Sequence, residues 1–291
     1  MKPSSRFAAS AGADVATKIP LESPLILVSA TTPEPLYHAF CGGEICAFTR
    51  PEPPGGAPNG DGLALIELSR DLGVLAVADG AGGTPGGNKA SGVALKELVR
   101  CITEGTFPKG DTALRERILD GFEAANKAVM KKLPGAATTL FVLEVRGRKV
   151  RSYHAGDSLL LGVSRGGKKK FHAVPHSPTG YAVESGLMPE AEALLHPENH
   201  IVSNLLGSPD LRIEVGSLMD LDVGDTVALA SDGLSDNMTL DEISTSIRAG
   251  HLPTCARRLA EAATHRMSGE SSSPFSKPDD LTVVLYRPQS R

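Results

Sequence analysis

The sequence predicts an α+β protein built as a four-layer αββα sandwich, in which two antiparallel sheets are flanked by helix pairs. Three observations lead to this fold class. Short apolar segments joined by glycine turns are typical of antiparallel hairpins rather than βαβ crossovers. These segments fall into two blocks, which can bury their apolar faces against each other. Amphipathic segments of helical period lie between the strands in two pairs, and each pair can cover one outer face.

The N-terminal half supplies the first strands and the first helix pair. Residues 25–32 (LILVSATT) read as an early strand, and a Pro/Gly-rich loop over 50–62 leads into another strand, LALIEL. The apolar run LGVLAVADG, of mostly small and β-branched residues, indicates a strand buried on both faces. Apolar residues then recur at helical spacing over 90–102 and over 111–133, where Asp111 can cap the second helix.

The C-terminal half contributes the second block of strands and the second helix pair. The segments TTLFVLEV, RKVRSYHAG, DSLLLGVS and KFHAV are separated by short turns, and TVALASD is a further strand. One helix is expected over 239–248, where Thr239 and Glu242 have the spacing of a capping box. Another is expected over 253–267, with Pro253 in its first turn, before the last strand, LTVVLY.

The chain is expected to form a single domain over residues 23–291. Residues 1–22 are rich in Ala and Ser and are predicted to be a poorly ordered N-terminal extension. Residues 175–209 have no clear period, so we expect an irregular insertion or a short-helix flap.

Composition excludes several classes of protein. The 291 residues are 41% hydrophobic and 22% charged, with a formal net charge of -4, as in ordinary globular proteins. This balance does not favour nucleic acid or an anionic membrane as partner. No apolar stretch approaches the ~20 residues of a membrane-spanning helix, and the N-terminus lacks the apolar core of a secretory signal. Four cysteines show no paired spacing, so we expect a cytoplasmic protein. A monomer is a separate expectation.

Acidic residues stand at strand ends in three places. Asp79 ends the run VLAVA, Asp232 follows TVALAS, and Asp279 and Asp280 precede LTVVLY. A turn explains one such acid, but three indicate a site. Carboxylates side by side repel one another unless cations neutralise them, and oxygen ligands suit Mg²⁺ or Mn²⁺. Two such ions can polarise a phosphoryl group and activate water for its hydrolysis.

Six motifs in order carry a family resemblance: NGDG, VADGAGG, AATTLFVLEV, HAGDSLLLG, LASDGLSD and DDLTVVL. Over residues 59–286 the chain resembles the metal-dependent type 2C protein phosphatases (the PPM family) in their bacterial form. The resemblance implies a serine/threonine phosphatase that acts on phosphoproteins. It implies the same αββα sandwich, with the metal site at one edge of the two sheets. It also implies two Mn²⁺ or Mg²⁺ ions, with a possible third.

The resemblance assigns roles to residues at the strand ends. Asp79 would bridge two metal ions, and the Gly80 carbonyl would bind the second of them. Asp61 would hold that second ion, partly through water. Asp232 and Asp279 would complete the shell of the first ion.

A third, looser ion would be supported by Asp157, together with Asp232. The catalytic residues would be Asp79 and Asp232, because their ions share the water that attacks phosphorus in line. The resemblance therefore implies hydrolysis without a protein nucleophile.

Several positions depart from the family pattern. Asp280 stands where the family has Asn, and Ala81 stands where many eukaryotic members carry His as a possible general acid. Gly56 replaces the Arg that binds the substrate phosphate, and Arg50 is the nearest candidate to take its place. This gap favours an alternative function, a catalytically weak phosphatase-like module that binds a regulatory partner. An Asp-rich set of turns without metal is a third reading, but it leaves the aligned acids unexplained.

Overall fold

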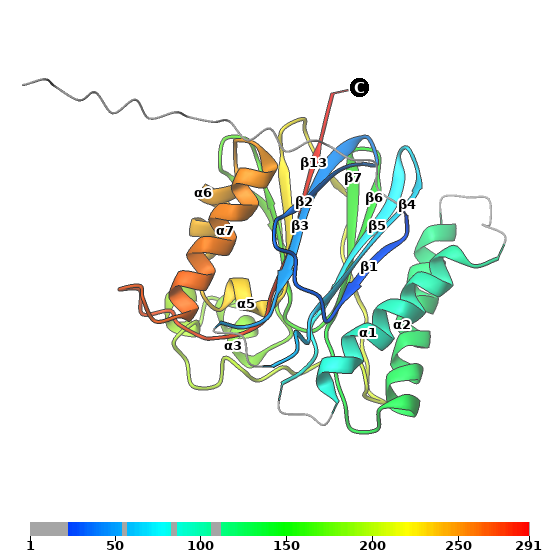
Figure 1. The fold of residues 1–291 in the computed structure, drawn as a ribbon, viewed down its shortest axis with the longest axis horizontal. Helices are drawn as coiled ribbons and strands as arrows, with labels where there is room; N and C mark the ends of the chain where they lie inside the picture. The colour runs from blue at the N-terminus through cyan, green and yellow to red at the C-terminus, as the bar shows by residue number, and fades with distance from the viewer. Residues whose placement is uncertain (1–22, 54–56, 83–85, 106–111, 291) are drawn as a thin grey trace, which may run out of the picture.

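The computed structural model describes residues 23–53, 57–82, 86–105 and 112–290 (Figure 1). Within this part, two antiparallel sheets pack face to face. One sheet has the core order β1 (Leu25–Val28), β4 (Gly62–Ser69), β5 (Leu72–Ala78), β6 (Leu140–Arg146), β7 (Lys149–Ala155) and β10 (Glu214–Val215), with β11 (Met219–Asp220) also paired to β7. The other has the order β2 (Leu36–Phe40), β3 (Gly43–Arg50), β13 (Leu281–Pro288), β12 (Thr226–Ala230), β8 (Leu159–Val163) and β9 (Lys169–His172).

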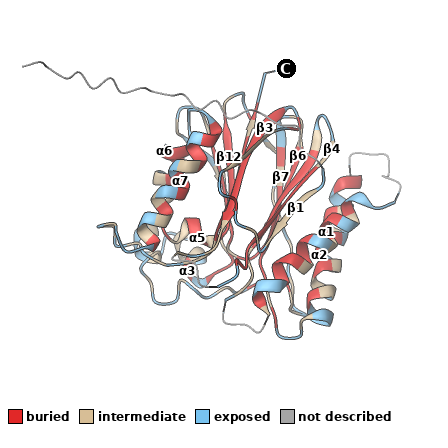
Figure 2. Cartoon of the chain, viewed as in Figure 1, coloured by how far each residue is buried: buried red, intermediate tan, exposed pale blue. Residues whose placement is uncertain are grey.

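Helices cover the outer face of each sheet. On one side lie α1 (Gly87–Thr103) and α2 (Ala113–Lys132), and on the other α6 (Leu240–Ile247) and α7 (Leu252–Met267). The predicted four-layer αββα sandwich is therefore confirmed. Burial colours show the buried helix faces turned toward the sheets (Figure 2).

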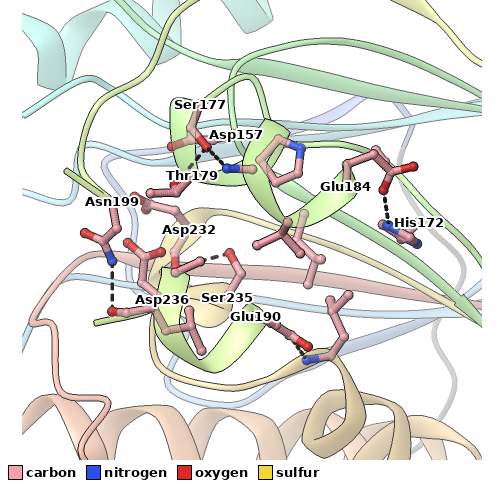
Figure 3. A pocket seen from close by; sticks show the side chains of 18 residues that line it. Asp157, His172, Ser177, Thr179, Glu184, Glu190, Asn199, Asp232, Ser235 and Asp236 are labelled. Carbon is pink, nitrogen blue, oxygen red and sulfur yellow. Dashed lines mark hydrogen bonds and ion pairs between the residues drawn. The ribbon is translucent and has the colours of Figure 1, made fainter. Parts of the chain in front are cut away.

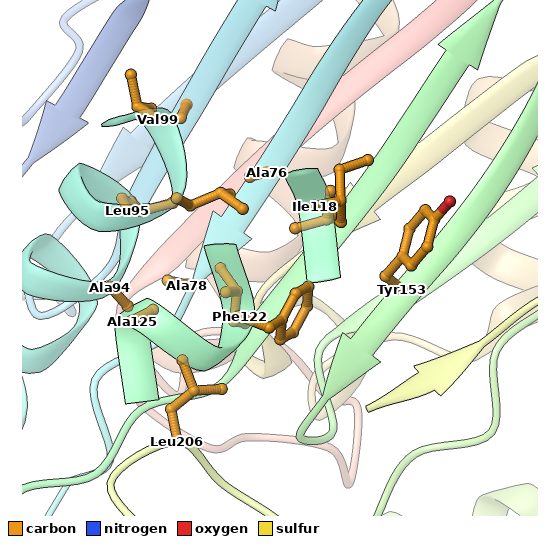
Figure 4. Packing of buried hydrophobic residues seen from close by; sticks show 14 of the residues in the cluster. Ala76, Ala78, Ala94, Leu95, Val99, Ile118, Phe122, Ala125, Tyr153 and Leu206 are labelled. Atoms are coloured by element: carbon orange, nitrogen blue, oxygen red, sulfur yellow. The ribbon is translucent and has the colours of Figure 1, made fainter. Parts of the chain in front are cut away.

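Three apolar layers hold the sandwich together. The layer between the sheets includes Leu63 and Leu75 from one sheet and Leu229 from the other. A second layer joins α1 and α2 to the first sheet, and Figure 4 shows Leu95 and Phe122 in it. The third joins α6 and α7 to the second sheet. Because each layer is fully buried apolar surface, burial at about 25 cal/mol per Å² is the main force that fixes the two sheets relative to each other.

Local signals at the helix ends agree with the structure where it describes them. Thr239 and Glu242 form the predicted capping box at the start of α6, and Pro253 lies in the first turn of α7. Asp111, predicted to cap the second helix, and the predicted extension over 1–22 lie outside the described residues. The N-cap of α2 is Thr112, whose side chain makes no capping hydrogen bond.

The structure corrects the sequence analysis at two places near the N-terminus. The first strand ends at Val28 rather than Thr32, because Ser29 adopts a left-handed φ of 50°. The hairpin β2–β3 was not predicted at all. Its turn residues Cys41 and Gly42 have φ values of 46° and 71°, as a two-residue hairpin turn requires, but Cys is an unusual residue there.

The segment over 175–209 contains two short helices, α3 (Pro178–Glu184) and α4 (Glu190–Ala193), joined by irregular chain. A further short helix, α5 (Asp232–Ser235), directly follows β12. In the described part of the chain, every helix falls short of the length and apolarity needed to cross a membrane.

Candidate active site

Five aspartates lie at one end of the sandwich, each within two residues of a strand end. Gly62 pairs with Ala78, which brings the residue before β4 and the residue after β5 to the same edge. Ala230 pairs with both Val283 and Leu159, so the end of β12 meets the starts of β13 and β8. Antiparallel pairing thus gathers all the acids that the sequence analysis selected as metal ligands: Asp61, Asp79, Asp157, Asp232 and Asp279.

These acids border a cleft of about 740 Å³. Asp79, Asp157, Asp232 and Asp279 line it directly. Asp61 lies beneath them and is 1% exposed. The cleft is therefore an acidic pocket with one further carboxylate in its floor.

The floor carboxylate, Asp61, is only half satisfied by the protein. Its Oδ2 accepts a hydrogen bond of 2.7 Å from Ser231 Oγ, and its backbone N–H donates to Asn59 Oδ1 at 2.9 Å. Its Oδ1 is buried without a hydrogen-bond partner, and so is Oδ1 of Asp232. Buried carboxylate oxygens without a partner are costly, so both atoms call for a ligand.

Burial and mutual repulsion make the charged form of these acids unfavourable. Burial, then the neighbouring Asp280 and Asp232, raises the pKa of Asp61 to about 7. Burial, then Asp232, raises the pKa of Asp279 to about 8. The pKa of Asp79 is raised well above its usual range by burial and by three carboxylate neighbours. Such a cluster is stable as carboxylates at neutral pH only with cations among them.

The turn that carries Asp79 is held by backbone contacts. The Asp79 N–H donates to Thr139 Oγ1 at 2.9 Å, and its carbonyl accepts from the Thr139 N–H at 2.8 Å. At Gly80, a Cβ would lie 2.3 Å from the Gly87 carbonyl oxygen and 2.9 Å from that of Gly60. No side chain fits at position 80, which leaves its backbone next to the cleft.

Asp280, where the family pattern has Asn, organises a neighbouring loop. Its Oδ2 accepts from the Gly60 N–H at 2.6 Å, and its Oδ1 accepts from the Glu52 N–H at 2.9 Å. Asp280 lines the cleft, and its two carboxylate oxygens hold the backbone at Glu52 and at Gly60, next to Asp61.

Two charged residues at the site were missed by the sequence analysis. Asp236 follows Asp232 by four residues, and Lys277 comes from the Ser-rich loop before β13. The Lys277 ammonium contacts Oδ2 of Asp232 at 3.4 Å and also pairs with Oδ2 of Asp236. The motif SDGLSD contains a signal for Asp236, since residues four apart share a helix face. No pattern in the sequence indicates Lys277.

Arg50, the candidate phosphate anchor, ends β3 opposite Leu281. Its guanidinium carbon lies 5.4 Å from the centre of the Phe48 ring, and its Nε is buried without a partner. Arg50 is absent from the residues that line the cleft, whereas Lys277 and His200 are among them.

The segment over 175–209 forms one wall of a second, smaller cavity of about 130 Å³ beside the cleft. Asp157 and Asp232 line both cavities. Figure 3 shows them with Asp236 on one side, and the contact between His172 and Glu184 on the other. The predicted flap segment therefore lines a cavity together with Asp157 and Asp232.

Another group with possible metal ligands, His154, His176 and Glu214, lies near Asp157 in the chain. The two imidazole rings stack face to face, with centres 4.3 Å apart and planes inclined by 16°. Lone pairs of imidazole lie in the ring plane, so those of stacked rings do not converge on one ion. His176 instead accepts from the Asn204 amide at 2.9 Å through Nδ1 and contacts Glu214 at 3.0 Å through Nε2. This group is a packing contact.

The aspartate cleft fits divalent cations by the chemistry of its donors. It offers carboxylate and backbone carbonyl oxygens, two of its carboxylate oxygens are buried without a partner, and Gly80 leaves room for close approach. Hard ions such as Mn²⁺ and Mg²⁺ prefer this set of ligands, whereas zinc prefers nitrogen and sulfur.

Comparisons with known proteins identify the family. A profile described as "Protein phosphatase 2C" matches residues 54–269. A putative protein phosphatase 2C-type of Streptococcus pyogenes is 26% identical over 197 residues, which cover 64% of this chain and 77% of that protein.

Solved structures show the same fold. The serine/threonine phosphatase of S. agalactiae superposes with a TM-score of 0.72 at 25% identity, over 85% of this chain and 100% of that one. The catalytic domain of the phosphatase PstP, solved in complex with 2 manganese ions, gives a TM-score of 0.64 at 23% identity, over 84% and 99% of the two chains. The profile match spans most of the sandwich and the greater part of its acidic edge, and the chain belongs to the protein phosphatase 2C family.

Proposed function

We propose that the chain hydrolyses phosphoserine and phosphothreonine on proteins and needs Mn²⁺ or Mg²⁺ to do so. The observation that carries the proposal is the cleft in which strand ends gather five aspartates, with unpartnered oxygens on Asp61 and Asp232. Membership of the protein phosphatase 2C family and the manganese ions in the PstP structure support this assignment.

The residues that would hold the ions form two overlapping sets. Asp61, Asp79, Asp232 and Asp279, with the Gly80 carbonyl, would hold two ions. Asp157 would support a third with Asp232, and Asp236 lies beside them. Ions bound there would stabilise the charge that develops on the phosphoryl oxygens and activate a shared water for in-line attack.

The chain itself fixes the geometry of the site. Thr139 holds the Asp79 turn, and Asp280 holds the loop before Asp61, so that the carboxylates keep their positions when the substrate enters. Ala81 lines the cleft and its side chain carries no proton donor, so the leaving serine or threonine oxygen would take its proton from water or from another group.

The phosphate anchor is the point on which catalytic strength depends. Lys277 and His200 are the basic residues among the described residues that line the cleft, and Arg50 stays a predicted anchor. The lack of an arginine there favours the alternative of a weakly catalytic binding module.

Hydrolysis of p-nitrophenyl phosphate and of phosphopeptides tests the proposal. We expect turnover that rises with Mn²⁺ and is lost in EDTA. Asp222→Asn is a suitable control, since this side chain is exposed and is not among the residues that line the cleft. Tight phosphopeptide binding without metal-dependent turnover would instead establish the binding module.

A further inference from the structure

The acids at the site form two groups that share Asp232. Asp79 is surrounded by the charges of Asp61, Asp232 and Asp279, which form the first group. Asp157 faces the charges of Asp232 and Asp236, which form the second group. The two groups differ because the second already contains a cation of the protein.

That cation is the ammonium of Lys277, which pairs with Oδ2 of Asp232 and Oδ2 of Asp236. The side chain is 30% exposed, so most of it lies inside the site. Lys277 also lies near enough to Asp279 for its charge to favour the ionised form of that acid. Within the described residues, no contact joins its ammonium to Asp61 or Asp79.

The backbone of Lys277 is fixed in place by Asn237. The Lys277 N–H donates to Asn237 Oδ1 at 2.9 Å, and the Lys277 carbonyl accepts from Asn237 Nδ2 at 2.8 Å. Asn237 is fully buried and also donates to the Gly233 carbonyl at 3.0 Å. The turn that follows α5, and that includes Asp236, therefore positions the lysine that pairs with Asp232 and Asp236.

The two oxygens of Asp232 are used differently. Oδ2 contacts Lys277, whereas Oδ1 is buried without a partner. An ion in the first group can bind through Oδ1 while Lys277 keeps Oδ2. An ion in the second group has to compete with an ammonium attached to the chain.

We propose that Lys277 acts as a built-in cation that fills the second acid group, so that the chain binds two divalent ions well and a third only by displacing this lysine. The proposal rests on the proposed function for the presence of ions in the first group. It goes further because it explains weak binding of the third ion by competition with the Lys277 ammonium.

Mn²⁺ titration of the full chain by isothermal calorimetry tests the proposal, with metal content of the dialysed protein as a second measurement. We expect two sites in the wild type. Lys277→Met keeps the aliphatic stem and removes the charge. It should bind a third ion more tightly than the wild type does, by roughly the 10- to 100-fold that contacts to metal ligands are worth in metal affinity. Lys277→Arg keeps the charge and should behave as the wild type.

The matched control is Lys170→Met. Lys170 also bridges two aspartates, Asp222 and Asp225, at 3.1 Å and 2.6 Å, but it is not among the residues that line the cleft. Its loss should leave the number and affinity of bound ions unchanged. A third ion gained equally by Lys170→Met would contradict the proposal.

The double variant Lys277→Met, Asp236→Asn should lose the gained ion, since one carboxylate of the second group is then neutral. If Lys277→Met is unfolded without metal, Mn²⁺ should restore its folding, because the ion replaces the lost charge. Unchanged Mn²⁺ binding in folded Lys277→Met, or a failure of Mn²⁺ to restore the unfolded variant, would overturn the proposal. If the wild type binds no Mn²⁺ in this titration, the proposed function is refuted instead.

Discussion

The floor carboxylate Asp61 should destabilise the metal-free protein at neutral pH. Its pKa is raised from 3.8 to about 7 in the folded state, chiefly by burial. The folded chain therefore holds a proton that the unfolded chain releases between these two pH values. The stabilisation that this proton provides is complete below about pH 4 and is lost as the pH rises through 7. In EDTA, we expect the wild type to melt at lower temperature at pH 8 than at pH 5.

The variant Asp61→Asn removes this dependence. An amide oxygen can still accept from Ser231, whereas the negative charge is gone. A shift of about three pKa units at 1.36 kcal/mol each makes the variant more stable than the wild type by about 4 kcal/mol at pH 8 in EDTA. For a domain of this size, that gain corresponds to a melting temperature roughly 10 °C higher.

Differential scanning calorimetry at pH 5 and pH 8, with EDTA and with Mn²⁺, measures these effects. In EDTA, the difference in melting temperature between Asp61→Asn and the wild type should shrink toward pH 5, where Asp61 is protonated in the folded wild type. Mn²⁺ should stabilise the wild type more than Asp61→Asn, since the variant lacks one ligand. Asp222→Asn serves as the exposed control and should show no such gain. A lower melting temperature of Asp61→Asn at pH 8 in EDTA would refute the reasoning.

Three further predictions concern activity. Asp79→Asn should abolish hydrolysis at saturating Mn²⁺, because a neutral amide cannot replace a carboxylate that bridges two ions. Asp232→Ala should have a similar effect. Retained turnover of p-nitrophenyl phosphate in Asp79→Asn would contradict the two-ion assignment. Asp157→Asn should slow turnover with little loss of the first two ions. Equal loss of every ion, measured by calorimetry, would contradict the assignment of Asp157 to the second acid group. If Arg50 is the phosphate anchor, Arg50→Ala should raise KM for a phosphopeptide with an unchanged Mn²⁺ requirement; an unchanged KM would show that the phosphate is held by other groups.

Much of the fold follows from local patterns in the sequence. The apolar periods locate both helix pairs and most strands, since a buried face has to repeat with the period of its element. The β2–β3 hairpin was not predicted, because its turn uses Cys41 at positive φ instead of Asn or Asp. In addition, β3 is buried along nearly its whole length and shows no alternation of apolar and polar residues. A strand of this kind is recognised only by its neighbours in the sheet.

The sequence by itself determined which acids stand at strand ends and, through the order of its motifs, which family they resemble. Asp61, Asp79, Asp157, Asp232 and Asp279 could be selected because each adjoins an apolar run. Only the tertiary structure decided what these acids meet. Lys277 enters the second acid group from a Ser-rich loop, and Asp280 binds the backbone of a loop more than 200 residues earlier in the chain. Pairing between distant segments depends on how the two sheets pack, and that packing leaves no periodic signal in the residues it brings together.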